Sequence, residues 1–341
     1  MNQRYTPPYS ITSEIVLLVA EIAQQLGGLT QQENYAKELR LNKINRIQTI
    51  QGTLGIEGNT LSQEQITAIL EGKHIIGPHR EIQEVRNAIK AYDQLETWDP
   101  FSESDLLSAH SVLMTGLVDS PGSYRTSGIG IMDGKRVDHL APPAGRIPSL
   151  MEDLFSWLEK TNEHPLISSS IFHYEFEFIH PFDDGNGRLG RLWQSLTLSR
   201  WNSIFINLPV ESLVFEHQQE YYSAINQSTK NSDSAKFIEF ILNIVLQSLK
   251  ASFTPEVTPE VTPEVIKMLN KLNSEMSRVE IQSKMGLKDE KHFRLHYLKP
   301  ALEAGLIEMT IPDKPKSRLQ KYRLTNKGKS QVPYSNPSLS R

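Results

Sequence analysis

Cysteine is absent from this sequence of 341 residues. Its absence excludes disulfides, thiol nucleophiles and thiolate zinc sites, and it fits a reducing compartment. Long apolar runs are also missing: near the amino end the longest is Ile15 to Ala20, far short of the ~20 residues that a membrane span needs. The first residues lack the apolar core and small-residue cleavage site of a signal peptide. We therefore expect a cytoplasmic protein without a membrane partner.

Charge is unevenly distributed along the chain. The net charge is −4, yet residues 264–341 carry 16 Lys and Arg against 8 Asp and Glu, which gives this part a local charge of +8. A basic carboxyl-terminal part on an acidic body predicts two regions with separate roles. Between them stands a threefold Thr-Pro-Glu-Val repeat at residues 254–265. A proline at every fourth position prevents a helix interior and favours an extended spacer.

Helical periodicity dominates the chain before the spacer. Thr12 is expected to cap a helix whose apolar face runs to Leu26, and the pair Gly27-Gly28 is expected to end it. Further helices are predicted at residues 33–51, 62–70, 80–97, 104–117, 147–160, 170–179 and 218–226. One β-hairpin is predicted at Ile129 to Val137, where Asp133-Gly134 forms the turn. The fold class is therefore mainly α.

The basic part after the spacer has the order of a winged helix-turn-helix domain. Helices are predicted at residues 264–273, 278–285 and 291–304, and strands at 306–311 and 319–324, joined by a basic loop. Between Ile311 and Lys329 lie the basic residues Lys314, Lys316, Arg318, Lys321, Arg323, Lys327 and Lys329, and the preceding helix adds Lys291, His292, Arg294 and Lys299. Such a surface fits DNA, but winged helices also dock proteins and form dimers. A DNA partner, a protein partner and a homodimer stay open.

The segment from His180 to Arg191 carries the residues best suited to chemistry. Pro181 disfavours helical geometry at His180, so a buried helix is expected to end there and to expose this histidine at a cleft. The loop Asp183-Asp184-Gly185-Asn186-Gly187 contains residues that tolerate positive φ, and such a loop can turn its N–H groups towards an anion. A helix beginning near Arg188 adds partial positive charge at the same place.

These residues together predict phosphoryl-group transfer. Arg188 and Arg191 lie three residues apart on one helix face and can hold a polyphosphate. Asp184 can bind Mg²⁺ together with substrate phosphates and water. His180 is suited to take a proton from an attacking hydroxyl.

At this point the sequence resembles a known family. Residues 180–191 read His-Pro-Phe-Asp-Asp-Gly-Asn-Gly-Arg-Leu-Gly-Arg and match the Fic signature, His-x-Phe-x-(Asp/Glu)-Gly-Asn-Gly-Arg-x-x-Arg, at every specified position. The resemblance implies a helical catalytic fold at about residues 104–248 and transfer of AMP from ATP to a Ser, Thr or Tyr hydroxyl of a target protein.

The resemblance also implies roles for individual residues. His180 is the base, Phe182 a core anchor and Asp184 the magnesium ligand, and the hairpin resembles the flap that holds the target segment by strand pairing. Residues implied to contact ATP are Gly185, Asn186, Gly187, Arg188, Leu189, Gly190 and Arg191, with Glu57, Glu177 and Tyr222. Tyr221 and Tyr222 fit a core position equally well.

A second motif lies near the amino end. Thr53 to Gly58 fits the pattern (Ser/Thr)-x-x-x-Glu-(Gly/Asn) of the inhibitory helix in Fic proteins, here expected at about residues 50–60. Without the resemblance, Gly58 and Asn59 would be a left-handed helix end. In the inhibitory interpretation, Glu57 pairs with Arg191 and occupies the donors meant for the γ-phosphate. Gly55 weakens this helix by roughly 1 kcal/mol.

These observations divide the chain into five segments: an amino-terminal helical region (1–103), the Fic domain (104–248), the linker (249–263), the winged-helix domain (264–330) and a tail (331–341). Three functions remain open. The first is an autoinhibited protein adenylyltransferase, which is a nucleotidyltransferase that uses ATP and Mg²⁺. The second is a DNA-binding regulator whose Fic domain senses a nucleotide, although sensing needs no base such as His180. The third is removal of AMP, or transfer of UMP or phosphocholine.

Overall fold

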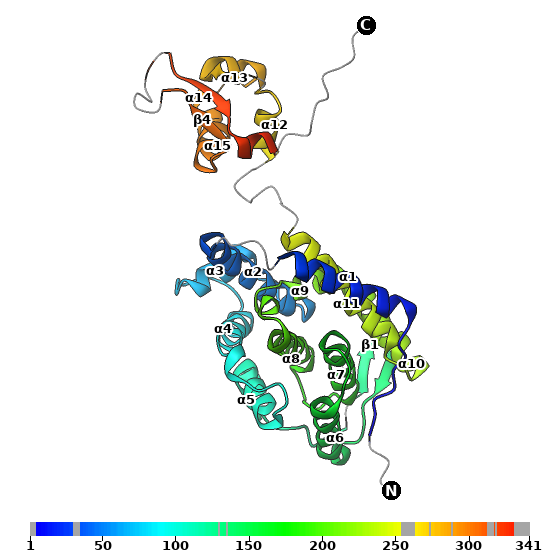
Figure 1. The fold of residues 1–341 in the computed structure, drawn as a ribbon. Coiled ribbons are helices and arrows are strands. Elements are labelled where there is room, and N and C mark those ends of the chain that lie inside the picture. The colour runs from blue at the N-terminus through cyan, green and yellow to red at the C-terminus, as the bar shows by residue number, and fades with distance from the viewer. Residues whose placement is uncertain are drawn as a thin grey trace. The chain divides into compact units, whose positions relative to one another are not determined.

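The computed structural model describes residues 5–29, 35–128, 130–133, 136–253, 263–272, 274–287, 289–311, 317 and 319–330. The chain divides into two compact units, Met1–Ser252 and Phe253–Arg341. The amino-terminal helices and the segment from His180 to Arg191 belong to the same unit (Figure 1). The spacer residues 254–262 and the tail from residue 331 lie outside the described residues.

Helices make up most of the first unit, as the sequence predicts. They are α1 (Ser13–Leu29), α2 (Tyr35–Ile56), α3 (Gln63–Leu70), α4 (His79–Asp93), α5 (Glu103–Met114), α6 (Ile147–Lys160), α7 (Pro165–Ile179), α8 (Asn186–Trp201), α9 (Val210–Glu216), α10 (Gln218–Asn231) and α11 (Ala235–Phe253). Three short 3₁₀ helices are η1 (Leu95–Thr97), η2 (Ala144–Arg146) and η3 (Ser203–Ile206). The hairpin consists of β1 (Gly130–Asp133) and β2 (Arg136–Leu140), paired antiparallel.

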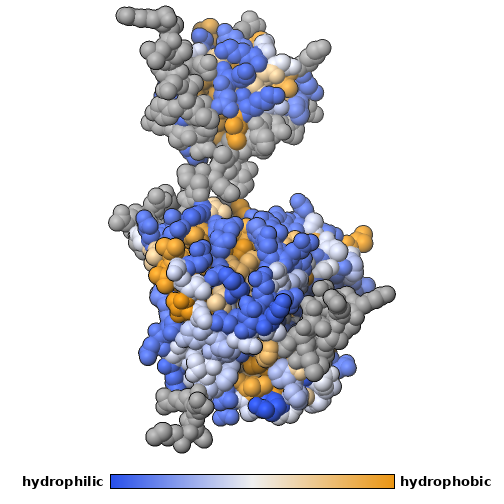
Figure 2. All heavy atoms as spheres, turned by 90° about the vertical axis from the view of Figure 1, so that its right-hand side faces the viewer, coloured by the Kyte–Doolittle hydropathy of each residue, from blue (hydrophilic) through white to orange (hydrophobic). Residues whose placement is uncertain are grey.

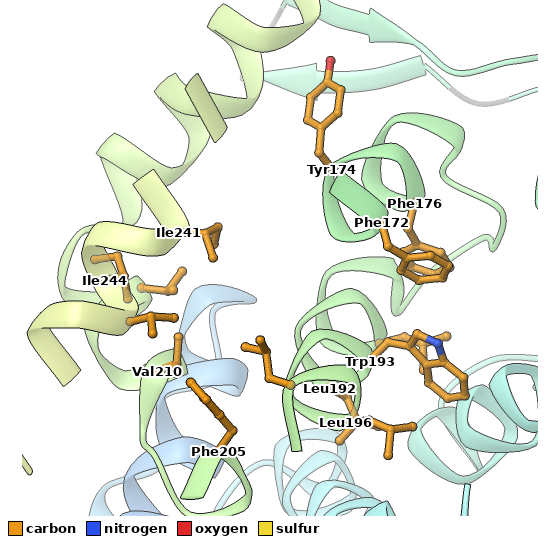
Figure 3. Packing of buried hydrophobic residues seen from close by; sticks show 14 of the residues in the cluster. Phe172, Tyr174, Phe176, Leu192, Trp193, Leu196, Phe205, Val210, Ile241 and Ile244 are labelled. Carbon is orange, nitrogen blue, oxygen red and sulfur yellow. The ribbon is translucent and has the colours of Figure 1, made fainter. Parts of the chain in front are cut away.

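Helices α7 and α8 lie side by side in the middle of this unit (Figure 1). Phe172 and Phe176 of α7 and Trp193 of α8 are fully buried and lie close together in the core (Figure 3). Phe155 of α6 meets Phe172 and Trp193 edge-on, with ring centroids 5.4 and 6.5 Å apart. The two helices that carry the motif therefore stand on a rigid aromatic core.

Several boundaries differ from the expected ones. Thr12 caps α1 as predicted, since its Oγ1 accepts the N–H of Ile15 at 3.2 Å, but the prediction that Gly27-Gly28 ends this helix is wrong. Burial of its apolar face outweighs the helix penalty of two glycines, about 1 kcal/mol each. Helix α2 continues past the expected end at Gln51 to Ile56, so the inhibitory motif forms its last turns. The sequence missed α9 and α11, and it placed the beginning of α7 five residues too late.

The second unit has its own core and a small sheet. Its elements are α12 (Pro263–Leu269), β3 (Met276–Ser277), α13 (Arg278–Lys284), α14 (Glu290–Phe293), the π-helical turn η4 (Arg294–Leu298), α15 (Lys299–Glu303), β4 (Ile307–Met309), β5 (Lys321–Leu324) and α16 (Asn326–Ser330). The sheet order is β3-β5-β4, with both pairs antiparallel. The third predicted helix is interrupted at η4, because Pro300 has no N–H to continue the regular ladder.

The basic surface expected on this unit is only partly described. Lys314, Lys316 and Arg318 lie outside the described residues. Arg323 pairs with Glu308 at 2.7 Å and with Glu275 at 3.2 Å, so its charge is balanced by acids. DNA binding stays a prediction.

The part of the chain that the structure describes contains no helix long and apolar enough to cross a membrane. Figure 2 shows one face of the protein, on which polar side chains predominate and hydrophobic ones gather in a few small groups.

Candidate functional site

His180 lies at the C-terminal end of α7 in a left-handed conformation, with φ 50° and ψ 61°. Its N–H still donates to the carbonyl of Phe176 at 2.9 Å. Pro181 disfavours right-handed helical geometry at this position, and a left-handed conformation of a residue other than glycine costs roughly 1 kcal/mol. The sequence predicted the end of the helix correctly. The left-handed turn that aims the histidine away from the helix was not predicted.

The surroundings of His180 favour its neutral form. Its Nδ1 is buried and has no hydrogen-bond partner among the described residues. Burial lowers the pKa of His180, while the nearby carboxylate of Glu177 partly opposes this effect. Burial also raises the pKa of Glu177, but His173, His180 and Arg191 outweigh it and hold this pKa below its ordinary value. At neutral pH the site thus combines an unprotonated imidazole with a charged carboxylate.

The loop after His180 is fixed by side chains that bind its own backbone. Phe182 is fully buried and stacks on the ring of His110, with centroids 3.7 Å apart. The amide of Asn186 accepts the N–H of Phe182 at 3.0 Å and donates to the carbonyl of the same residue at 2.9 Å. The Asn186 side chain is therefore committed to shaping the loop, and only its main-chain N–H is left for the predicted phosphate contact.

Helix α8 begins at Asn186, two residues before the expected position. Gly185 precedes it with φ 88°, a left-handed conformation that suits glycine. The N–H groups of Asn186, Gly187 and Arg188 form the first turn, where no preceding helical carbonyl can accept them. Together with the partial positive charge of the helix end, these N–H groups favour an anion at this place, and binding of a phosphate here stays a prediction.

Asp184 is surrounded by cations. Its Oδ1 accepts Nη2 of Arg188 at 2.7 Å and the N–H of Gly185 at 2.6 Å, and its Oδ2 accepts Nη2 of Arg80 at 2.9 Å. The side chain is 39% exposed. Within the described ranges, no group of three His, Asp or Glu side chains could bind a metal ion by itself. The donor set therefore fits Mg²⁺ only if substrate phosphates and water complete the coordination.

Arg191 is held by the inhibitory motif. Its Nε donates to Oγ1 of Thr53 at 3.0 Å, and its Nη2 donates to the carbonyl of Thr53 at 3.0 Å and to Oε1 of Glu57 at 2.7 Å. The Arg191 side chain is 3% exposed, against 32% for Glu57. Burial alone would lower the pKa of Arg191, but the Glu57 carboxylate raises it above its ordinary value. The expected ion pair between Glu57 and Arg191 is present.

The Glu57 carboxylate also lies against the start of α8. A Cβ atom on Gly187 would stand 2.5 Å from Oε1 of Glu57, so only glycine leaves room for the carboxylate here. Gly58 has φ 88° and ends α2 as a left-handed cap, as predicted. On the other side, Gln218 of α10 donates to the carbonyl of Ile56 at 2.8 Å. Contacts from two helices thus position Glu57.

The two tyrosines of α10 differ. Tyr221 is buried, and its hydroxyl lies 3.2 Å from Nε2 of His173, so it belongs to the core. Tyr222 is 45% exposed. Burial raises its pKa, and the nearby charge of Glu57 adds to the rise. Tyr222 therefore lies at the rim of the site, where its role as a nucleotide contact stays a prediction.

Three residues that bind the segment around His180 and Asp184 were missed by sequence reasoning. His110 accepts the N–H of Gly122 at Nδ1 (2.8 Å) and therefore carries its proton on Nε2, which donates to the carbonyl of Asp184 at 3.0 Å. Arg80 binds the Asp184 carboxylate, and Arg125 binds the turn around His180. His110 and Arg80 lie 74 and 104 positions before Asp184, and Arg125 lies 55 positions before His180, so no local motif marks these contacts.

Comparison with known proteins identifies the family. Residues 100–198 match the Fic/DOC family, and residues 263–325 match the C-terminal domain of Filamentation induced by cAMP protein Fic-like. The crystal structure of a Fic family protein from Desulfovibrio desulfuricans G20 is 47% identical, covers 95% of this chain and 99% of that chain, and superimposes with a TM-score of 0.71. The chain belongs to the Fic family. The resemblance predicted from residues 180–191 is confirmed.

Other Fic proteins agree with this assignment. Fic-1 from C. elegans shares the fold at 23% identity, with a TM-score of 0.60 over 70% of this chain and 71% of that chain. A protein from Aedes aegypti, named protein adenylyltransferase Fic, is 31% identical over 223 residues, which are 62% of this chain and 42% of that protein. The chain thus spans less than half the length of the first curated relatives that it matches.

Proposed function

We propose that this Fic protein transfers AMP from ATP to a Ser, Thr or Tyr hydroxyl of a target protein. The observation that carries the proposal is the position of His180 at the end of α7, joined by a short loop to α8 with its arginines and close enough to feel the charge of Glu57, the partner of Arg191. A base next to a site for a polyphosphate is the arrangement that nucleotidyl transfer requires. The names of the curated relatives favour AMP over UMP or phosphocholine.

The geometry supports the following roles. Neutral His180 takes the proton of the attacking hydroxyl, which then forms a bond to the α-phosphorus of ATP while the bond to the β-phosphate oxygen breaks. The main-chain N–H groups at the start of α8 hold phosphate oxygens, and Arg188 and Arg191 stabilise the charge of the departing pyrophosphate. Glu177 holds a negative charge near His180, which favours the imidazolium formed during transfer.

A magnesium ion fits this site as a companion of the nucleotide. Asp184 would hold it, after exchange of the Arg80 guanidinium that now binds Oδ2. When bound, Mg²⁺ supplies positive charge to the phosphates.

Glu57 accounts for restraint of this activity. Its carboxylate occupies the donors of Arg191 and adds a negative charge where the γ-phosphate would lie. ATP can then bind only in a pose that leaves the reacting atoms misaligned. We therefore propose an autoinhibited enzyme, whose active form requires that Glu57 leave Arg191.

The test is transfer of label from α-labelled ATP. Parallel reactions with α-labelled CTP, GTP and UTP show which nucleotide the protein uses. The protein is incubated with Mg²⁺ and a cell extract, and labelled proteins are identified by mass spectrometry. His180→Ala should lower transfer by about 10²- to 10⁴-fold while ATP binding persists. Labelling that is unchanged in this variant would refute the role of His180.

A further inference from the structure

Arg125 lies between α5 and the hairpin, and its side chain is buried at 2% exposure. The guanidinium donates to four main-chain carbonyls and to no carboxylate among the described residues. Its Nε donates to His180 (2.7 Å), Nη1 to Ser127 (2.7 Å), and Nη2 to Pro142 (2.7 Å) and to Ile179 (3.3 Å). The main-chain N–H of Arg125 also donates to the carbonyl of Pro181 at 2.9 Å.

Three of these bonds fix the turn that carries the base. The carbonyls of Ile179, His180 and Pro181 follow one another at the end of α7, where helical carbonyls lack partners and the helix dipole is negative. A cation at this end is favourable, which helps to offset the burial of the charge. The left-handed conformation of His180 is therefore held by Arg125 from one side and by the bond to Phe176 from the other.

The other two bonds fix the hairpin. Ser127 precedes β1 by three residues, and Pro142 follows β2 by two. One guanidinium therefore joins both ends of the hairpin to the His180 turn. A change in the position of either part must stretch or break bonds to the same side chain.

We propose that Arg125 is a positioning residue that sets the hairpin in register with His180, so that a target hydroxyl presented along the hairpin arrives within reach of the imidazole. This inference rests on the proposed transfer to a protein hydroxyl. A misplacement of about 1 Å can reduce the rate of a positioned reaction by about 10²-fold, so a residue without substrate contact can control it.

The four carbonyls that the Arg125 side chain binds belong to different parts of the chain, and only arginine has enough donors in different directions to reach them all. Its planar fork places donors in several fixed directions, whereas lysine carries its three donors on one nitrogen. Lysine at this position would keep the charge but lose contact with at least one of the two parts. Arg125→Lys therefore separates two roles. If only the charge of Arg125 matters, this variant should keep its activity, whereas loss of activity indicates that the several hydrogen bonds are needed.

The experiment compares Arg125→Ala, Arg125→Lys and the control Arg200→Ala in the Glu57→Gly protein. Arg200 also donates to two main-chain carbonyls, those of Glu96 and Trp98, outside the site. We expect both Arg125 variants to lower target labelling at saturating ATP, the alanine variant by about 10²-fold, with the Kd for ATP changed less than twofold. The control should label normally. Added guanidinium ion at millimolar concentration should raise target labelling by Arg125→Ala at least tenfold. It should not raise labelling by Arg125→Lys or by the control.

Amide hydrogen exchange supplies a readout that does not depend on transfer. In otherwise unaltered protein, Arg125→Ala and Arg125→Lys should exchange faster in β1 and β2, while α8 and the core of α7 stay protected. Unchanged exchange in the hairpin, normal labelling by Arg125→Lys, or a loss of ATP binding equal to the loss of rate would each overturn the proposal. If Glu57→Gly with intact Arg125 labels nothing, the proposed function fails, whereas the exchange data still decide whether Arg125 couples the hairpin to His180.

Discussion

Removal of the Glu57 carboxylate should raise activity and lower stability at the same time. In Glu57→Gly, Arg191 keeps its two bonds to Thr53 but loses the only carboxylate with which it forms an ion pair among the described residues. The freed guanidinium can then bind the γ-phosphate. The same loss leaves a buried charge without its counterion, which destabilises the folded state.

The size of both effects follows from one contact. A hydrogen bond to a charged group contributes about 1.5–3 kcal/mol. Since 32% of the Glu57 side chain is exposed, solvent screening places the value near the lower end, at about 2 kcal/mol. This free energy corresponds to a roughly 30-fold larger fraction of the open, competent state. In a unit of this size it also corresponds to a melting temperature lower by about 4–8 °C.

Two measurements on the same preparations test this prediction. Self-labelling with α-labelled ATP and Mg²⁺ gives the activity, and calorimetry gives the melting temperature. Glu57→Gln keeps the shape and removes the charge, so it should give a smaller gain in activity. Glu71→Gly is the control, since its carboxylate pairs with exposed Lys73 outside the site, and it should change labelling little. Arg191→Ala added to Glu57→Gly should abolish the gain.

In Glu57→Gly the activity is expected to rise and the stability to fall, and these opposite changes distinguish autoinhibition from a purely structural role of Glu57. If Glu57 only ended a helix, its loss would lower stability and either lower activity or leave it unchanged. Glu57→Gly protein that labels no better than the unaltered chain, with ATP, Mg²⁺ and target supplied, would refute the autoinhibition and leave the catalytic assignment of His180 untouched.

Three further predictions concern packing, pH and metal. Gly52→Ala places a Cβ 2.5 Å from a carbonyl of α9 and should lower the unfolding free energy by about 1–3 kcal/mol in urea melts, whereas Gly27→Ala, with nothing within 4 Å, should raise it by about 0.5–1 kcal/mol. Burial lowers the pKa of His110 to about 4 from 6.5. Between these two pH values the unfolded chain therefore binds a proton on this imidazole that the folded chain does not bind. The contribution of His110 to stability should therefore fall by on the order of 3 kcal/mol between pH 6.5 and 4, and in denaturant melts the His110→Gln variant should lose less stability over this range than the unaltered protein. Asp184→Asn should raise the Mg²⁺ concentration needed for half-maximal ATP binding about tenfold in calorimetric titrations of the Glu57→Gly protein, and an unchanged requirement would remove Asp184 from the metal site.

The part of the site that could be predicted is the part built from neighbours in sequence. His180, Asp184, Arg188 and Arg191 are separated by so few residues that a helix end, a glycine loop and a helix start fix their relative positions. The pairing of Glu57 with Arg191 spans 134 positions and was accessible only through the family resemblance. Without the resemblance, the local sequence around Glu57 predicted only the end of a helix at Gly58 and Asn59.

The rest depends on tertiary packing. Arg125 and His110 donate hydrogen bonds to main-chain carbonyls. Every residue has such a carbonyl, so no pattern of side chains in the sequence indicates their partners. Asn186 was expected on phosphate through the family resemblance, but the fold uses both ends of its side-chain amide to close the loop around Phe182. Boundaries such as the end of α1 were misjudged because glycine propensity was weighed without the core that overrides it.

The packing of α2 restricts how Glu57 can leave Arg191, as the proposed autoinhibition requires. A Cβ on Gly52 would meet the α9 backbone at 2.5 Å and one on Gly55 would meet Phe215 at 2.9 Å, so these helices interlock without spare room. Sliding or rotation of α2 as a rigid body would therefore disturb its packing against α9. Its final turn, closed by bonds from Glu57 and Asn59 to the carbonyl of Leu54, is the part that can unwind. Under the proposed autoinhibition, activation would then need only the fraying of this single turn, and a ligand that binds the short frayed peptide would keep Glu57 away from Arg191.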